Sequence, residues 1–546
     1  MSARTDSSDG LAAASNRGPA VRRQMVDGSL RILIAEGLIL PTGLITAAFL
    51  TRHLGPSKYG LFTLASVVVL WIEFFVTSAF SRAAIKLIGD AEDWRPWAGT
   101  LVRFYLLAGV LAALLLWLVS GQLGRLLGEP AMAGYLRLFA LDIPIFSLAT
   151  AHRDILVGMH RYQERALASA VRWIARLVLI VVLIWAGLSV RGAIWAMIGA
   201  SLLDFATARY YVRPPFWGRF PVRLRRLWDY ALPLFLSGVA MRLFDKLDLF
   251  VLKVRGASAA TAGLYGAAQN LTVVPALIGT AFAPVLLAAL TDTMRGGEEE
   301  LAREVARDAV KFTMLLLPFA ALIAASSPAI ATLVLGQAFA PAAPFLAILI
   351  FAGFARLLVS VSLSILIAAE RPRWVLLLTG PIIPLALAAY VAAILYGGAR
   401  GAAFTTTMLS VLLTIFSLVA VYLAWGVKPS AASTARTALF SVMAYALALA
   451  WPATGIMLLI KLAVIGGLVP VGYFVSGEFG RNEIALLRSL VLPKAFPVDE
   501  KASATRKPVV MGVIRDEDRY APSGPSVCLR SLSGNCSSCR GAHLPQ

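Results

Sequence analysis

Four charged residues lie close together in an otherwise apolar stretch, residues 230–254. They are Arg242, Asp245, Lys246 and Asp248. If this stretch crosses a bilayer, each central charge costs about 2.5–3.5 kcal/mol and needs a partner, a watery cavity or a route to the interface. A spacing of three places Arg242 beside Asp245 on a helix, so an internal ion pair is one interpretation. Because Lys246 follows Arg242 by four residues, excess positive charge facing an anion-binding cavity is the other.

A single arginine, Arg356, lies near the middle of another apolar stretch, residues 345–368. That stretch contains no carboxylate to pair with it. We therefore expect Arg356 to be the principal anion-binding residue. Arg103 and Arg176 differ, because they lie only about one turn inside their apolar stretches, where long side chains extend to the lipid headgroups.

Acidic residues form a second group within apolar stretches: Glu36, Glu73, Asp142 and Asp204. A buried carboxylate either pairs with a cation or binds a proton or metal cation, as in an ion-coupled transporter. The same two interpretations, ion pair or ion coupling, apply to Asp245 and Asp248. Pairing with arginines is the favoured interpretation for this group, and proton or sodium coupling is the alternative for Glu36 and Glu73.

Prolines within the apolar stretches are candidate hinges. Pro41, beside Gly43, and Pro233 fall within the first and the seventh stretch, which are the first spans of the two halves. Proline removes a backbone hydrogen bond and kinks a helix, although it is common in membrane helices generally. We predict hinges at Pro41, Gly43 and Pro233.

All three cysteines, Cys528, Cys536 and Cys539, lie near the C-terminus with His543. Four such side chains could hold zinc, but their spacing matches no established zinc motif and their neighbours supply no core. We predict no metal site, no other cofactor and no disulfide framework.

Composition identifies the elements that must position these residues. Of 546 residues, 59% are hydrophobic and 15% charged, against about 45–50% and about 25% in soluble domains. A soluble enzyme is thereby excluded. The apolar residues form about fourteen runs near the length of about 20 residues that spans a bilayer. We predict spans at 32–50, 60–80, 100–120, 138–156, 173–190, 193–211, 230–254, 264–290, 312–335, 345–368, 374–396, 402–426, 438–451 and 455–475.

The chain carries 50 Lys and Arg against 30 Asp and Glu, a formal net charge of +20. Much of the excess lies in short loops on alternate sides of the predicted spans, which the positive-inside rule explains better than nucleic-acid binding. Both termini are then cytoplasmic. The predicted parts are a cytoplasmic tail (1–30), an N-lobe of six helices (31–212), a basic cytoplasmic linker (213–228), a C-lobe of six helices (229–427), two additional helices (428–477) and a cytoplasmic, largely disordered tail (478–546).

An internal repeat relates the two predicted lobes. Gly60, between spans one and two, and Gly263, between spans seven and eight, are 203 residues apart. A second pair, Gly158 after span four and Glu370 after span ten, is 212 residues apart. Because six is even, duplicated six-helix halves enter the membrane from the same side as parallel repeats.

These segments resemble the polysaccharide transport family, the oligosaccharide flippases of the multidrug/oligosaccharidyl-lipid/polysaccharide exporter superfamily. The resemblance covers residues 30–492 and is carried by residues 54–62 (LGPSKYGLF), 158–162 (GMHRY), Asp248 with 263–265 (GLY), and 477–483 (GEFGRNE) with 486–488 (LLR). It implies an all-α polytopic membrane protein whose two lobes form a V, with spans one, two, seven and eight around a central cavity. Arg82 would then point into a cytoplasm-facing vestibule, and Arg82, Arg242, Lys246 and Arg356 would bind substrate.

The implied activity is movement of a polyprenyl-diphosphate-linked oligosaccharide, an O-antigen, exopolysaccharide or capsule unit, to the outer leaflet of the bacterial inner membrane by alternating access. A proton- or sodium-coupled multidrug or organic-cation exporter is the alternative, but it would need a carboxylate-dominated cavity. A membrane-embedded sugar polymerase would need a large outer loop, and every predicted outer loop is short, so we predict no enzyme. Expected partners are the lipid-linked oligosaccharide, membrane lipid and a glycan polymerase or other assembly protein.

Overall fold

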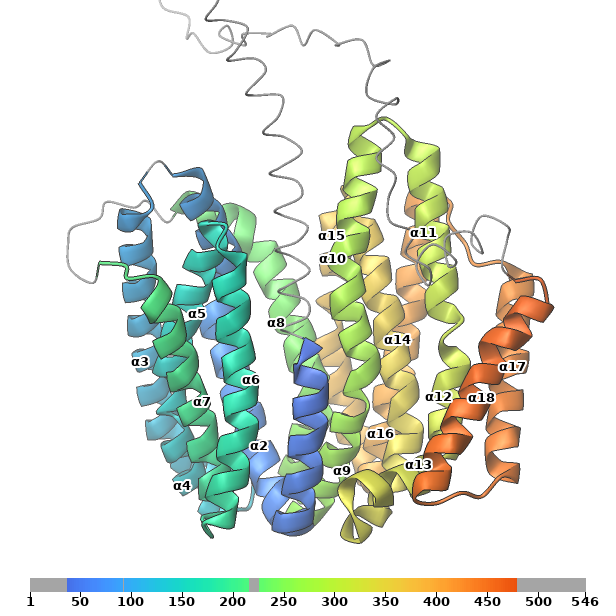
Figure 1. Cartoon of the computed structure of the whole chain (residues 1–546), viewed down its shortest axis with the longest axis horizontal. Helices are drawn as coiled ribbons and strands as arrows, with labels where there is room; N and C mark the ends of the chain where they lie inside the picture. The colour runs from blue at the N-terminus through green and yellow to red at the C-terminus, as the bar shows by residue number, and fades with distance from the viewer. Residues whose placement is uncertain (1–36, 92, 216–224, 479–546) are drawn as a thin grey trace, which may run out of the picture. The chain divides into compact units, whose positions relative to one another are not determined.

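The structure is a computed structural model that describes residues 37–91, 93–215 and 225–478. These residues form helices and no strand (Figure 1). The first lobe contains α2 (Ile39–Asp90), α3 (Arg95–Leu126), α4 (Pro130–Phe139), α5 (Asp142–Gly158), α6 (Tyr162–Trp185) and α7 (Ser189–Tyr211). The second contains α8 (Arg225–Val254), α9 (Ala259–Leu271), α10 (Val273–Arg295), α11 (Glu299–Met314), α12 (Leu317–Ala325), α13 (Ser327–Ile330), the π-helical η1 (Ala331–Leu335), the 3-10 turn η2 (Gln337–Ala342), α14 (Ala343–Ala368), α15 (Pro372–Thr379) and α16 (Ile382–Trp425). Two further helices follow, α17 (Ala431–Ala450) and α18 (Ile456–Val475).

The predicted spans correspond to helical segments along the described chain. Nine helical ranges in that part are long and apolar enough to cross a membrane. Two of these ranges each contain two predicted spans, because α2 turns at Gly55 (φ 69°) and α16 turns at Gly398 (φ 54°). Glycine permits this left-handed backbone without a steric penalty. The protein is therefore a multi-pass, all-helical membrane protein.

The predicted linker, 213–228, overlaps the start of α8, whose described part begins at Arg225. Residues 225–228 contain no glycine or proline to interrupt the helix, so it extends toward the basic segment. The tails 1–30 and 479–546 lie outside the described residues.

The turns after α5 and before α15 confirm the duplication but correct its register. His160 (φ 59°) and Glu370 (φ 56°) are both left-handed, and they are 210 residues apart. The hydrogen bond from the Arg161 amide to the Leu156 carbonyl recurs from Arg371 to Leu366 at the same offset. The predicted offset of 212 was wrong because it matched side-chain letters, whereas the backbone turn defines the equivalent positions.

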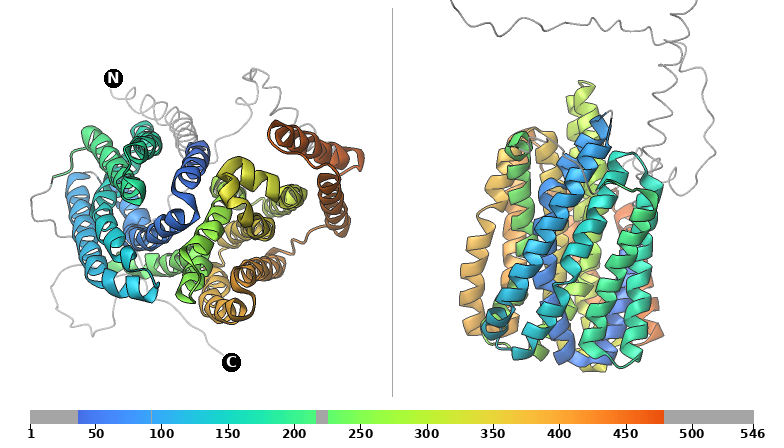
Figure 2. Two further views of the ribbon diagram at one scale, coloured as in Figure 1. Left: turned by 90° about the horizontal axis from the view of Figure 1, so that it is seen from below. Right: turned by 90° about the vertical axis from the view of Figure 1, so that its left-hand side faces the viewer.

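The two lobes meet where α2 crosses α9 (Figure 2). A Cβ on Gly60 would lie 2.0 Å from the Ala259 carbonyl oxygen, and a Cβ on Gly263 would lie 2.0 Å from the Pro56 carbonyl oxygen. Pro56 and Ala259 are separated by the same 203 residues as Gly60 and Gly263. The contacts are thus reciprocal, as expected where a pseudo-twofold axis passes between two repeats, and glycine permits the close backbone approach.

The last two helices are attached to the second lobe through α12 and through a cluster at the end of α18. Glu478 accepts hydrogen bonds from Ser433 and from Arg436 Nη1 (2.6 Å), and Lys311 Nζ lies 3.6 Å from its carboxylate. Burial alone raises the pKa of this carboxyl, but the hydrogen bonds from Ser433 and Arg436 and the charge of Lys311 hold its pKa below the ordinary value. The ionised carboxylate therefore ties α17 and α18 to α11.

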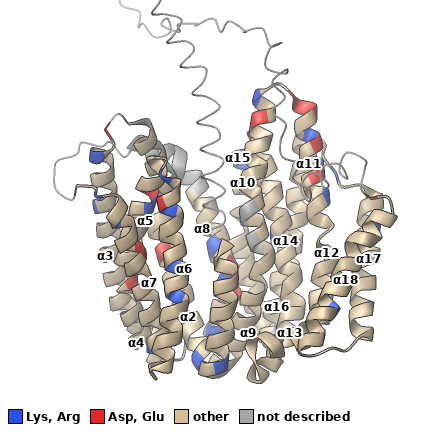
Figure 3. Ribbon diagram, in the orientation of Figure 1, with Lys and Arg blue, Asp and Glu red and all other residues tan. Residues whose placement is uncertain are grey.

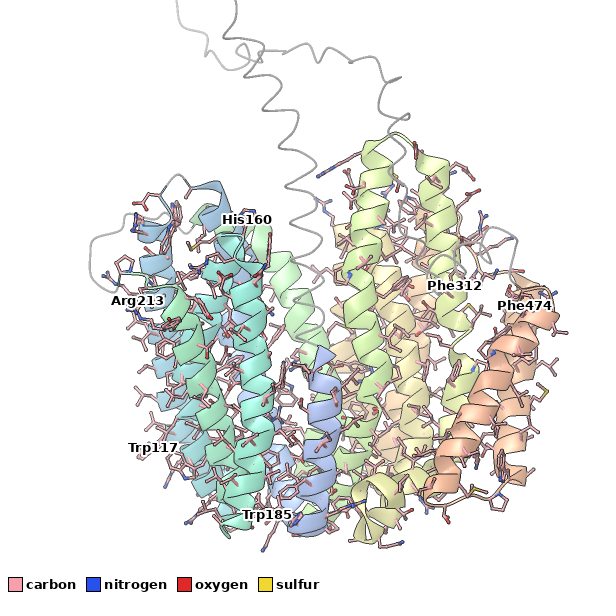
Figure 4. The ribbon with its side chains drawn as sticks, in the orientation of Figure 1. Trp117, His160, Trp185, Arg213, Phe312 and Phe474 are labelled. Carbon is pink, nitrogen blue, oxygen red and sulfur yellow. The ribbon has the colours of Figure 1, made fainter. Side chains whose placement is uncertain are left out.

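Aromatic and polar residues mark the two ends of the first lobe (Figure 4). Trp117 and Trp185 project outward from the lower part, with 50% and 74% of their surface exposed, while His160 and Arg213 lie toward the upper end. His160 and Arg213 belong to loops predicted to be cytoplasmic. Exposed tryptophans of this kind are typical of the membrane interface.

Candidate functional site

Helix α8 presents a charged cluster that is completed by α14. Arg242 Nη1 lies 4.0 Å from Asp245 Oδ2, and Arg356 Nη1 donates a hydrogen bond to Asp245 Oδ1 at 3.3 Å. The internal ion pair expected from the spacing of Arg242 and Asp245 is therefore present. Arg356 also has a carboxylate partner. The partner, Asp245, belongs to α8, so inspection of the apolar stretch that contains Arg356 could not identify it.

Lys246 extends from α8 toward α9. Its Nζ donates to Gln269 Oε1 (3.1 Å) and Asn270 Oδ1 (3.4 Å). These acceptors are uncharged amide oxygens, so the hydrogen bonds satisfy the ammonium group without neutralising it. Lys246 thereby joins α8 to α9 beside Asn270.

Asp248 lies in a fully buried polar network that joins α8, α9 and α16. Its carboxylate accepts hydrogen bonds from the Tyr265 hydroxyl (2.7 Å), Gln269 Nε2 (2.7 Å), the Thr406 hydroxyl (2.8 Å) and the Leu249 amide (2.8 Å). Four uncharged donors compensate the cost of burying a carboxylate. Asp248 therefore connects three helices. None of these four hydrogen bonds comes from Arg242 or Arg356.

The first lobe contains a second charged cluster, visible among α5, α6 and α7 (Figure 3). Arg153 Nη1 lies 2.9 Å from Asp204 Oδ2, and Arg172 Nε lies 4.0 Å from the same atom. Arg153 and Arg172 lie within α5 and α6, and their side chains are only 11% and 14% exposed. In the sequence, the acidic residue Asp204 within an apolar stretch was the indication that such arginines exist, because its partners had to come from other helices.

Glu73 and Asp142 belong to the same cluster and come from α2 and α5. Both residues are buried, and each has one carboxylate oxygen without a hydrogen-bond partner. Glu73 interacts electrostatically with Arg172 of its own lobe and with Arg242 of the other. Arg242 thus connects the two charged clusters, and its backbone carbonyl accepts a hydrogen bond from Trp71 Nε1 of α2.

A cavity of about 160 Å³ lies between the lobes. Its lining includes Gly43 and Tyr59 from α2, Arg176 from α6, and Asn270 from α9. Arg176 was expected to extend to the headgroups, but it lines this cavity because α6 begins at Tyr162, which places residue 176 well inside the helix. Tyr59 accepts a hydrogen bond from Asn270 Nδ2 (2.9 Å), so the two repeats are in contact at the cavity wall.

The structure describes the remaining predicted site residues only in part. Glu36 lies outside the described residues, and for Arg82 and Pro233 the structure describes only the helical backbone, in α2 and α8. Pro41 lies in the first described turn of α2, and the backbone stays helical through Gly43. The hinges therefore remain predictions.

Polar contacts between the lobes also flank the α2–α9 crossing. Lys253 Nζ, with a side chain only 5% exposed, lies 2.8 Å from Glu129 Oε1 of the first lobe. Arg52 of α2 donates a hydrogen bond to the Leu333 carbonyl of the second lobe. These contacts hold this end of the interface closed.

Among the described residues, no group of three or more His, Cys, Asp or Glu could hold a metal ion. The cysteine-containing tail lies outside the described residues.

Two six-helix repeats with charged residues at their interface define a membrane transporter fold. A family model described as "Polysaccharide biosynthesis protein" matches residues 49–344, more than half of the chain. The chain belongs to this family. The search of curated proteins gave no match.

Solved structures confirm the fold. "Lipid II flippase MurJ, inward closed conformation" has a TM-score of 0.68 at 15% identity, covering 83% of this chain and 99% of that one. An "outward-facing conformation of a multidrug resistance MATE family transporter of the MOP superfamily" has a TM-score of 0.55 at 17% identity, covering 74% and 95%. The Vibrio cholerae MATE transporter VcmN in the bent form has a TM-score of 0.51 at 16% identity, covering 77% and 99%. The chain therefore has the fold of these solved transporters.

Proposed function

We propose that this protein is a flippase that moves a polyprenyl-diphosphate-linked oligosaccharide from the cytoplasmic to the outer leaflet of the bacterial inner membrane by alternating access. The observation that carries the proposal is the arrangement of cations at the lobe interface. Arg176 of the first repeat lines the cavity, and Lys246 of the second repeat contacts Asn270 in the cavity wall. Arg242 and Arg356 extend the positive charge along α8 and α14.

The chemistry of such a substrate fits this arrangement. A diphosphate is too polar for the bilayer interior, and an arginine about 4 Å from a phosphate contributes about 4 kcal/mol at an effective dielectric constant near 20, before desolvation. A few arginines therefore offset the loss of hydration, while the polyprenyl chain stays in lipid. The family and the lipid II flippase similarity support the same class of substrate.

Within this proposal both termini are cytoplasmic, and the protein works with a glycan polymerase or another assembly protein. The predicted domain boundaries apply, except that α8 begins at Arg225. Arg82 faces the vestibule, and Pro41, Gly43 and Pro233 act as hinges. Glu73 is better suited to ion coupling than Asp248, because one of its buried oxygens has no hydrogen-bond partner, whereas Asp248 is engaged by four donors.

Binding of undecaprenyl-diphosphate sugar to the purified protein tests the proposal. In one detergent, the wild type is compared with Arg356→Ala, Arg242→Ala and the exposed control Arg295→Ala. Loss of a charge-assisted hydrogen bond worth about 1.5–3 kcal/mol predicts roughly 10- to 100-fold weaker binding for the first two variants. The control should bind like the wild type.

The alternative function is an ion-coupled exporter of organic cations, which the buried Glu73 and Asp142 and the similarity to MATE transporters favour. Tetraphenylphosphonium serves as the comparison ligand in the same assay. Binding of this cation, lost in Glu73→Gln, together with no binding of the lipid-linked sugar, would replace the flippase by the exporter.

A further inference from the structure

Asp245 lies between two arginines that come from different helices. Its Oδ2 is 4.0 Å from Arg242 Nη1 of α8, and its Oδ1 is 3.3 Å from Arg356 Nη1 of α14. Charge-assisted hydrogen bonds between guanidinium and carboxylate groups are usually about 2.7–2.9 Å long. Both contacts are therefore loose, and one carboxylate is divided between two cations.

Asp245 and Arg242 are also accessible, and Arg356 is partly so. Asp245 is 37% exposed, Arg242 35% and Arg356 16%. Asp204 in the first lobe is also near two arginines, Arg153 at 2.9 Å and Arg172 at 4.0 Å, but its side chain is fully buried. Burial separates Asp204 from solvent and from any incoming anion, whereas Asp245 is open to both.

A second carboxylate on α8, Asp248, has the neutral hydrogen-bond donors that Asp245 lacks. Asp248 is fully buried and is held by Tyr265, Gln269 and Thr406. Asp245 instead accepts a hydrogen bond from Arg356 Nη1 of α14. Displacing Asp245 therefore breaks arginine contacts and leaves the network of neutral donors intact.

We propose that Asp245 is an intramolecular competitor of the substrate, and that an incoming diphosphate displaces its carboxylate from Arg242 and Arg356. The inference rests on the proposed flippase function and assigns a role within the same site. A diphosphate carries more negative charge and more acceptor oxygens than a carboxylate, and guanidinium groups bind phosphate oxygens bidentately. It can therefore outcompete a loose ion pair.

The consequence concerns release of the substrate. When the diphosphate leaves, Asp245 returns to the two arginines, so they are not left as uncompensated charges in a site of low dielectric constant. Asp245 thus weakens substrate binding and speeds dissociation, which a transporter needs for turnover. The other charged groups near the pair, Lys246 on α8 and Glu73 on α2, remain in place throughout.

Equilibrium binding of undecaprenyl diphosphate to the full-length protein in detergent tests this inference. The variants are Asp245→Asn, Asp245→Ala and Arg356→Ala, with the exposed Asp292→Asn as the matched charge control. Freeing the two arginines from one loose ion pair should tighten binding by Asp245→Asn and Asp245→Ala roughly tenfold and slow dissociation. Asp292→Asn should leave the Kd unchanged, and Arg356→Ala should weaken binding.

A neutral ligand separates charge competition from a general change of the site. Undecaprenol, which lacks phosphate, should show the same affinity for the wild type and for Asp245→Asn. If the wild type binds undecaprenyl diphosphate but Asp245→Asn binds equally or more weakly, Asp245 does not compete and the inference is wrong while the flippase proposal stands. If neither protein binds the diphosphate, both proposals are overturned.

Discussion

Charged side chains inside this protein are paired mainly between helices. Arg356 of α14 pairs with Asp245 of α8, and Arg153 of α5 pairs with Asp204 of α7. A charge within the bilayer needs a compensating partner, and lipid supplies none. Pairing between helices both compensates the charge and specifies which helices pack together. Analysis of one helix at a time detects such residues but not their partners.

The residue with the clearest structural role is Asp248, and we predict that Asp248→Ala destabilises the protein. The substitution removes the carboxylate that accepts from the buried Tyr265 hydroxyl and from Gln269 Nε2, and each lost hydrogen bond to a buried donor costs about 1–3 kcal/mol. Thermal unfolding in detergent should show a lower Tm for Asp248→Ala, a smaller decrease for Asp248→Asn, and none for the exposed Asp292→Asn. Wild-type stability combined with lost transport would instead point to ion coupling.

At the scale of elements, the duplication determines how α2 packs against α9 where the two helices cross. Gly60 and Gly263 occupy equivalent positions, and each meets the backbone of the opposite repeat. A glycine at each position lets two helix backbones approach more closely than any side chain allows. The polar contacts of Lys253 with Glu129 and of Arg52 with Leu333 reinforce the same end.

We predict that Gly60→Ala and Gly263→Ala each destabilise the lobe interface by about 3 kcal/mol or more, because the added methyl group would overlap a backbone carbonyl oxygen. Gly121→Ala in α3 is the matched control, since a Cβ there meets no atom within 4 Å. It should be neutral or stabilise the helix by about 0.5–1 kcal/mol. Measurements of Tm and of monodisperse yield in detergent decide this, and equal stability for all three variants would contradict the close crossing.

At the scale of the whole molecule, the distribution of basic loops predicts the orientation in the membrane. The rule that short cytoplasmic loops carry most Lys and Arg places both termini in the cytoplasm and the loop around Leu188 outside. The native cysteines all lie between residues 528 and 539, which makes them natural reporters for one side.

We therefore predict that a membrane-impermeant maleimide labels Cys528, Cys536 and Cys539 in inside-out vesicles and not in right-side-out vesicles. The reverse pattern is expected for Leu188→Cys in a background with the three cysteines changed to serine. Detergent-solubilised protein, in which every thiol is accessible, controls for reactivity. Labelling of the native tail from the outside would reverse the proposed topology.

Much of this protein was determined by local properties of the sequence. Apolar runs of about twenty residues can satisfy their backbone hydrogen bonds in lipid only as helices, so the class and the approximate spans followed directly. The duplication was visible in the spacing of Gly60 and Gly263, and the Arg242–Asp245 pair followed from helical periodicity.

Only the tertiary structure decided which charges face one another. It assigned Arg356 to Asp245, paired Arg153 and Arg172 with the buried Asp204, and placed Arg176 at the interlobe cavity. It also corrected the second repeat offset from 212 to 210. The physical reason is that helical periodicity relates residues three and four positions apart, whereas these contacts join helices separated by up to 111 residues, and their geometry depends on how the helices pack.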